Sequence, residues 1–128
     1  MAEEDLNQSP EQNVELKSEE GSERRKSVRR VLRTTAVVIL NESQTFEVRT
    51  VDVSINGMAI VAPANPKPGV VFYIRFKVPL KNKGYENFES KARVVHSIYS
   101  SSESGFKIGL NFIQLPQNFA TLLEKFIE

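Results

Sequence analysis

The 128-residue chain contains no cysteine, no tryptophan and a single histidine, His96. The absence of cysteine excludes disulfide scaffolds, thiolate zinc sites, iron–sulfur clusters and cysteine nucleophiles. No apolar run approaches the ~20 residues that span a bilayer, and the acidic N-terminus is unlike a secretory signal. We therefore expect a cytoplasmic protein that does not insert into a membrane.

Sequence motifs of enzyme chemistry are missing too. The chain has no Gly-x-x-x-x-Gly-Lys-Ser/Thr phosphate loop, no Gly-x-Ser-x-Gly elbow and no His-Glu-x-x-His metal motif. Two carboxylates, Glu86 and Glu89, lie in the polar segment 81–89, which is interpreted as a solvated connection. We expect no enzyme, no catalytic residue, no metal and no other cofactor.

Charge is distributed unevenly along the chain. Residues 1–23 carry eight acidic side chains and one lysine, whereas residues 24–33 carry six cations and no acid. The first 22 residues are too poor in apolar groups to offset an ordering cost of ~1–2 kcal/mol per residue. We expect 1–22 to be a disordered acidic tail ahead of one domain over 23–128. The tail either stays solvated or folds back over the arginines until a tighter anion displaces it.

Apolar and polar residues alternate along most of the chain after residue 34, a pattern that predicts β-strands. The clearest strand is Val70–Val78, and the others are Ala36–Leu40, Phe46–Val51, Met58–Ala62, Lys91–Tyr99 and Phe106–Phe112. The period changes to that of an amphipathic helix at about 118–127, with Asn118 as its N-cap. The fold predicted is mainly β: a six-stranded antiparallel β-barrel with a C-terminal α-helix.

Arginine supplies five of the six cations in the arm 24–33. A planar guanidinium binds phosphate or the O6/N7 edge of guanine with two parallel hydrogen bonds and stacks on a base. Taken alone, this run fits a solvated arm, a nonspecific nucleic-acid contact or a small-anion site.

A turn sequence, Asp52-Val-Ser54-Ile-Asn-Gly57, lies between two expected strands. Asp52 and Ser54 put a carboxylate and a hydroxyl two residues apart, hence on one side of an extended backbone. Gly57 permits a positive φ or the close approach of a ligand. The same residues also fit an ordinary Asx or Ser/Thr turn with a turn glycine.

The order Arg25-x-x-x-Arg29 followed by Asp52-x-Ser54-x-x-Gly57 resembles the PilZ domain family, which binds bacterial cyclic di-GMP. The resemblance covers about residues 23–128 and includes the ending Gly-Leu-Asn-Phe and the terminal helix. It implies that Arg25 and Arg29 grip phosphate and guanine. Asp52 and Ser54 would read a guanine edge or a phosphate, and Gly57 would leave room for the ligand.

Two further candidates follow from the resemblance. Arg24 matches family members with an extra arginine, and would contact a second, stacked nucleotide. His96 stands where many members carry an aromatic residue that stacks on guanine. Alternatively, His96 packs on the strand face that it would share with Ala92, Val94 and Ile98.

Arg29-x-x-x-Arg33 is a rival frame for the arginine motif, but the Arg25/Arg29 frame leaves the usual distance to the first strand. Lys26 and Arg30 are assigned to electrostatic steering of the anionic ligand.

The expected function is a cyclic di-GMP receptor in a bacterial cytoplasm. Ligand binding would change the conformation of the arm and signal to a downstream protein. One alternative is a small barrel that binds single-stranded nucleic acid, with Tyr73 or Tyr99 stacking bases, although the near-neutral barrel makes nucleic acid an unexpected partner. Another is a PilZ-like adaptor that has lost the ligand.

Overall fold

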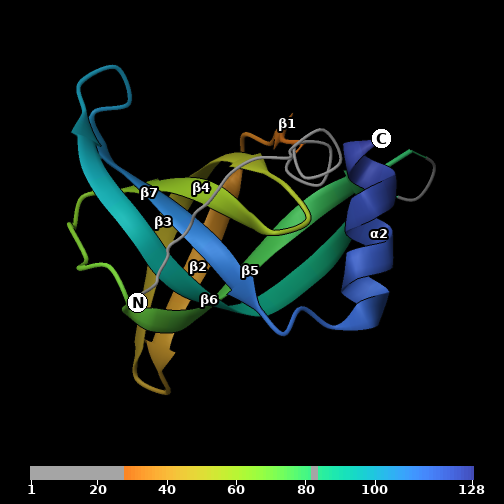
Figure 1. Cartoon of the computed structure of the whole chain (residues 1–128), viewed down its shortest axis with the longest axis horizontal. Coiled ribbons are helices and arrows are strands. Elements are labelled where there is room, and N and C mark those ends of the chain that lie inside the picture. Colours follow the sequence, from red (N-terminus) through yellow and green to blue (C-terminus); the bar gives the residue numbers. More distant parts are fainter. Residues whose placement is uncertain (1–27, 82–83) are drawn as a thin grey trace, which may run out of the picture.

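The computed structural model describes residues 28–81 and 84–128. In these residues one antiparallel sheet contains β1 (Arg30–Val31), β2 (Thr35–Asn41), β3 (Gln44–Val53), β4 (Gly57–Ala62), β5 (Val71–Leu80), β6 (Gly84–Ser100) and β7 (Gly105–Ile113). The strand order is β1-β3-β2-β5-β6-β7-β4. Because β3 also pairs with β4, the sheet closes into a ring of strands, with β1 added beside β3 (Figure 1).

The core fills the inside of this ring. Strand β5 shows why: its buried side chains, Phe72, Ile74, Phe76 and Val78, alternate with exposed ones, as a half-buried strand requires. The helix α2 (Gln117–Ile127) lies at one end of the ring (Figure 1). Its apolar stripe buries Leu123 and Phe126, and the Phe119 ring lies 5.1 Å from the Phe88 ring between centroids. The predicted mainly β fold with a C-terminal helix is confirmed.

The predicted connection over residues 81–89 is wrong from Gly84 onward. Strand β6 starts there and pairs with β5 as far as Leu80↔Gly84. Phe88 faces the core and is fully buried, while Glu89 forms an exposed ion pair with Arg75 at 3.0 Å. A single large apolar residue among polar neighbours was too weak a signal, and pairing with β5 extends the strand through the polar residues.

The predicted helix cap is also wrong. The cap position is Pro116, with φ −56° and ψ 142°, and no side chain caps the helix. The fixed φ of proline suits the residue before a first turn, so Asn118 falls inside the helix.

The acidic tail 1–22 and the first residues of the arm, including Arg24, Arg25 and Lys26, lie outside the described residues. The predictions made for them therefore stay predictions.

Candidate ligand-binding site

The arm joins the sheet beside the predicted turn. Strand β1 pairs with the end of β3, with Arg30 opposite Val53 and Val31 opposite Asp52. Just before β1, the Arg29 guanidinium donates a hydrogen bond from Nη1 to Asp52 Oδ1 at 2.9 Å. One residue from each predicted motif is thus in direct contact.

Asp52 reaches the outer face of the ring because β3 is irregular next to it. The register with β4 runs from Thr50↔Ile60 to Asp52↔Ala59, which leaves Val51 as an extra residue. A bulge of this kind re-aims the side chains that follow it. The Asp52 side chain remains 22% exposed and that of Arg29 48% exposed, so solvent and ligands reach the ion pair.

Ser54 organises the turn between β3 and β4. It is buried, and its Oγ accepts hydrogen bonds from the amides of Asn56 and Gly57, each at 3.2 Å. The Ser54 amide in turn donates to the Gly57 carbonyl at 2.7 Å. The turn interpretation of this serine therefore holds in the structure, and Ser54 is also one of the residues that line the hollow described below.

Gly57 is required by the neighbouring strand. A Cβ atom placed there would lie 1.9 Å from the Leu110 carbonyl oxygen and 3.1 Å from Asn111 Cα. Its φ is outside the left-handed region, so conformational freedom is not the reason for glycine. The sequence predicted a positive φ or the close approach of a ligand at Gly57; in the structure the group that approaches closely is the backbone of β7.

An open hollow of about 420 Å³ lies beside the ion pair, lined by Arg29, Ser54, Asn56, Asn111 and Phe112. This volume is within the range of small-molecule sites. Asn111 lies opposite Gly57 in the β4–β7 pairing, and the Phe112 amide donates to the Asn56 carbonyl at 2.8 Å. Asn56 lies within the predicted turn, and Asn111 and Phe112 lie in the Gly-Leu-Asn-Phe ending, but no binding role was predicted for these three residues. The sequence feature that could have identified them is the presence of two asparagines, Asn56 and Asn111, in these segments.

His96 lies on the outer face as well, and the predicted packing with Ala92 and Val94 is wrong. The β6–β7 register moves from Val94↔Leu110 to His96↔Gly109, so Val95 is the extra residue of an irregularity. Val94 stays buried, whereas His96 is exposed with its ring over Gly109. A Cβ at Gly109 would lie 2.3 Å from His96 Cε1.

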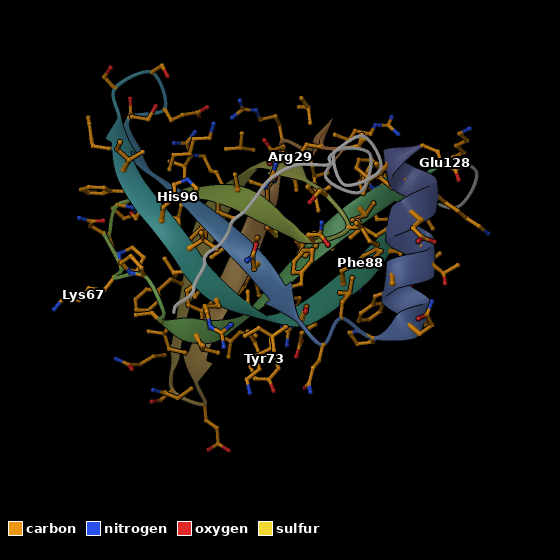
Figure 2. All side chains as sticks on the ribbon, viewed as in Figure 1. Arg29, Lys67, Tyr73, Phe88, His96 and Glu128 are labelled. Atoms are coloured by element: carbon orange, nitrogen blue, oxygen red, sulfur yellow. The ribbon has the colours of Figure 1, made fainter. Side chains whose placement is uncertain are left out.

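One cross-strand row connects Asp52 with His96. Asp52 pairs with Ala59, Ala59 with Gly109, and Gly109 with His96. Three strand spacings correspond to roughly 14 Å. Between the two polar ends, Ala59 is buried with Val51 and Val61, and Gly109 is buried beneath the His96 ring. Figure 2 shows Arg29 and His96 in the same upper half of the view. Tyr73 lies in the lower half of that view.

Arg33 takes part in a different contact. Its Nη1 and Nη2 donate to the two carboxylate oxygens of Glu103, each at 3.1 Å, and Arg49 Nη2 donates to the Glu103 carbonyl at 2.6 Å. The hydrogen bonds from Arg33 lower the pKa of the Glu103 carboxyl below its usual range, and the same pairing raises the pKa of Arg33. The two possible arginine motifs, Arg25-x-x-x-Arg29 and Arg29-x-x-x-Arg33, both contain Arg29, which contacts Asp52. Arg33 instead contacts Glu103 in the turn between β6 and β7.

Among residues 28–81 and 84–128, no group of three or more histidine, aspartate or glutamate side chains is close enough to hold a metal ion. The polar groups at the hollow include the side-chain amides of two asparagines and the Arg29 guanidinium, beside the Asp52 carboxylate, a set suited to an organic anion.

Comparison with known proteins assigns the class. The sequence pattern of the PilZ domain matches residues 23–128, and the chain belongs to the PilZ domain family. PilZ domains are binding and adaptor domains rather than enzymes. In the described part of the chain, no helix has the length and apolar character needed to cross a membrane.

A solved structure shares this fold. The Bacillus subtilis inhibitor of motility, MotI/DgrA, superposes with a TM-score of 0.69 at 14% sequence identity, over 78% of this chain and 47% of that chain. This chain therefore matches less than half the length of its structural neighbour. No curated protein sequence matches it.

Proposed function

We propose that the chain is a cyclic di-GMP receptor of the bacterial cytoplasm that binds its ligand at the hollow beside Arg29 and Asp52. The observation that supports this most is the Arg29–Asp52 contact at the edge of an open, polar hollow, in a member of a family that binds this nucleotide. The ligand offers two phosphates and two guanines, which match a guanidinium donor and a carboxylate acceptor.

The ion pair can open to the ligand at small cost. Exposed arginine–carboxylate pairs contribute only ~0–1 kcal/mol. Hydrogen bonds to charged groups contribute ~1.5–3 kcal/mol each, so phosphate on Arg29 and a guanine edge on Asp52 outweigh the broken pair. Without ligand, each of the two groups holds the other near the hollow.

The arm completes the proposed site. Arg25 precedes Arg29 in the family motif and would supply a second guanidinium, and Arg24 would contact a second nucleotide if one stacks on the first. Ordering of the arm over the ligand would then present a new surface to a downstream protein. His96, at the far end of the cross-strand row, would give a small ring on which a base can stack.

A second candidate function, single-stranded nucleic-acid binding, is favoured by one observation. Tyr73 is 46% exposed on the outer face of β5, where it pairs with Lys91 and is flanked by Arg75 and Arg93. An aromatic ring among cations is the arrangement on which bases stack. Arg93 pairs with Asn111 of the hollow, so this surface adjoins the hollow, and Tyr73 and Lys91 are the residues that distinguish the two candidates.

Calorimetric titration of cyclic di-GMP into the full chain tests the proposal. Arg29→Ala should weaken binding roughly tenfold or more, since a charge-assisted contact is lost. Arg75→Ala is the matched control because it breaks an exposed pair of the same kind, with Glu89 at 3.0 Å. Equal affinities for wild type and Arg29→Ala would contradict the assigned site.

Base preference and salt dependence separate the candidates. Asp52→Ala should reduce the preference for cyclic di-GMP over cyclic di-AMP, whereas Glu89→Ala should leave it unchanged. Affinity for a single-stranded oligonucleotide would fall by orders of magnitude between about 50 and 200 mM salt, and a compact guanine site should lose less. Tight, salt-sensitive oligonucleotide binding without cyclic di-GMP binding would favour the second candidate, and no binding of either would favour an adaptor.

A further inference from the structure

Arg30, the residue next to Arg29, extends toward a different element. Successive side chains of an extended backbone leave on opposite sides. Arg29 bonds to Asp52 on β3, and Arg30 contacts Phe126 on α2. Figure 1 shows β1 and the C-terminal end of α2 at the same edge of the molecule. The sequence predicted only electrostatic steering for Arg30, and the contact with Phe126 was not predicted.

The contact has two parts. Arg30 Nη1 donates a hydrogen bond to the Phe126 carbonyl oxygen, and the guanidinium carbon lies 4.4 Å from the centroid of the Phe126 ring. A cation over an aromatic face is attracted by the ring quadrupole. The carbonyls of the last helical turn lack intrahelical partners and form the negative end of the helix dipole. One arginine thus satisfies a helix-end carbonyl and stacks on the ring of the same residue.

The helix side of this contact is firmly anchored. Phe126 is only 8% exposed and belongs to the main core, together with the fully buried Leu123 one turn earlier. The contact therefore connects the arm with the barrel core through α2.

The arm side has few other anchors. Strand β1 is two residues long, and both residues are exposed, Val31 by 68%. In the described part of the arm, residues 28–33, the first core residue is Leu32, whose amide donates to the Val51 carbonyl at 3.0 Å. Between residues 28 and 31, the Arg29 ion pair and the Arg30 contact with α2 are the side-chain interactions that hold the described arm in place.

We infer that Arg30 is a positioning residue: by clamping the arm to the last turn of α2 it aims Arg29 at the hollow, and it links ligand occupancy to the stability of that turn. This inference rests on the proposed function. Linkage is reciprocal, so a ligand that fixes the arm through Arg29 also holds Arg30 on the helix end. The C-terminal turn of α2 then reports whether the hollow is occupied.

The test combines cyclic di-GMP titration with amide hydrogen exchange of residues 124–128 in the full chain. In wild type, ligand should slow exchange of these amides. Arg30→Ala should bind about three- to tenfold more weakly, because an exposed cation–π contact and its hydrogen bond are lost, and ligand should no longer slow exchange in α2. Arg30→Lys keeps the charge and a donor, and should lie between the two.

Control variants distinguish a positioning role of Arg30 from a general effect of positive charge and from a loss of folding. Lys125→Ala removes a cation from the same helical turn and should behave as wild type. Phe126→Leu keeps the carbonyl and most of the apolar volume but removes the ring, and should reproduce the effect of Arg30→Lys. Failure of wild type to bind contradicts the proposed function. Binding by wild type, with unchanged affinity and unchanged protection of α2 in Arg30→Ala, overturns the positioning role alone.

Discussion

Two glycines of the outer face, Gly57 and Gly109, should respond very differently to alanine. A methyl group at Gly57 meets backbone, the Leu110 carbonyl oxygen at 1.9 Å. A methyl group at Gly109 meets only the imidazole of His96 among its three nearest atoms, at 2.3, 2.7 and 3.1 Å. The backbone of Leu110 is held by hydrogen bonds between β7 and β4 and cannot move alone, whereas the exposed His96 ring can rotate away.

The distances set the size of each effect. To restore an ordinary contact of about 3.4 Å, β4 and β7 must separate by roughly 1.5 Å at Gly57, which breaks the backbone hydrogen bonds there. With each unmade bond costing ~1–3 kcal/mol, Gly57→Ala should lower the free energy of unfolding by about 3–5 kcal/mol. Displacing the His96 ring costs ~0.5–1.5 kcal/mol, and replacing a strand glycine by alanine gains ~0.5–1 kcal/mol. Gly109→Ala should therefore stay within about 1 kcal/mol of wild type.

Urea unfolding of the single variants, repeated in a His96→Ala background, measures both effects. Without the imidazole, Gly109→Ala should stabilise by ~0.5–1 kcal/mol, while Gly57→Ala should cost as much as before. A Gly57→Ala variant within 1 kcal/mol of wild type would refute the close-approach argument. An effect of Gly109→Ala that does not depend on His96 would refute the placement of the ring.

Three further predictions concern the supports of the site. Ser54→Ala should cost ~1–3 kcal/mol in urea unfolding, because the amides of Asn56 and Gly57 lose their buried acceptor. Leu123→Ala should cost ~2–5 kcal/mol, since this side chain is fully buried between α2 and the sheet; a smaller loss would mean that the helix is loosely packed. The lowered pKa of Glu103 means that its stabilisation is complete above the ordinary glutamate pKa and is lost as pH falls through the lowered value. The difference in urea midpoint between wild type and Glu103→Gln should accordingly shrink over that acidic range, and a constant difference would contradict the role of the Arg33 pair.

Strands with strong alternation were predictable from the sequence, and those held by pairing alone were not. Val70–Val78 carries large apolar residues at every second position, and the structure has β5 there. The first half of β6 offers Phe88 among polar residues, and β1 offers two residues of a basic arm. Both form because a neighbouring strand supplies hydrogen-bonding partners, which a single-segment pattern does not contain.

At the site, too, some features were predictable from the sequence and others depend on how the strands pair. The motif order predicted that the arm and the turn come together, and Arg29 does contact Asp52. Of the two alternatives for His96, the one that packed it with Ala92 and Val94 is wrong, because an irregularity at Val95 inverts the alternation after Val94. The partner of Arg30 depends on where α2 ends in space, and no spacing within the arm encodes it.

Binding of cyclic di-GMP at the hollow is tested most directly by an amide ¹⁵N–¹H NMR titration of the full chain, because this titration locates the ligand without any substitution. If cyclic di-GMP binds at the hollow, the largest chemical-shift changes will fall on Arg29, Asp52, Asn56 and Asn111, with smaller changes at His96. Changes centred on Tyr73 and Lys91, or no changes at saturating ligand, would contradict binding at the hollow.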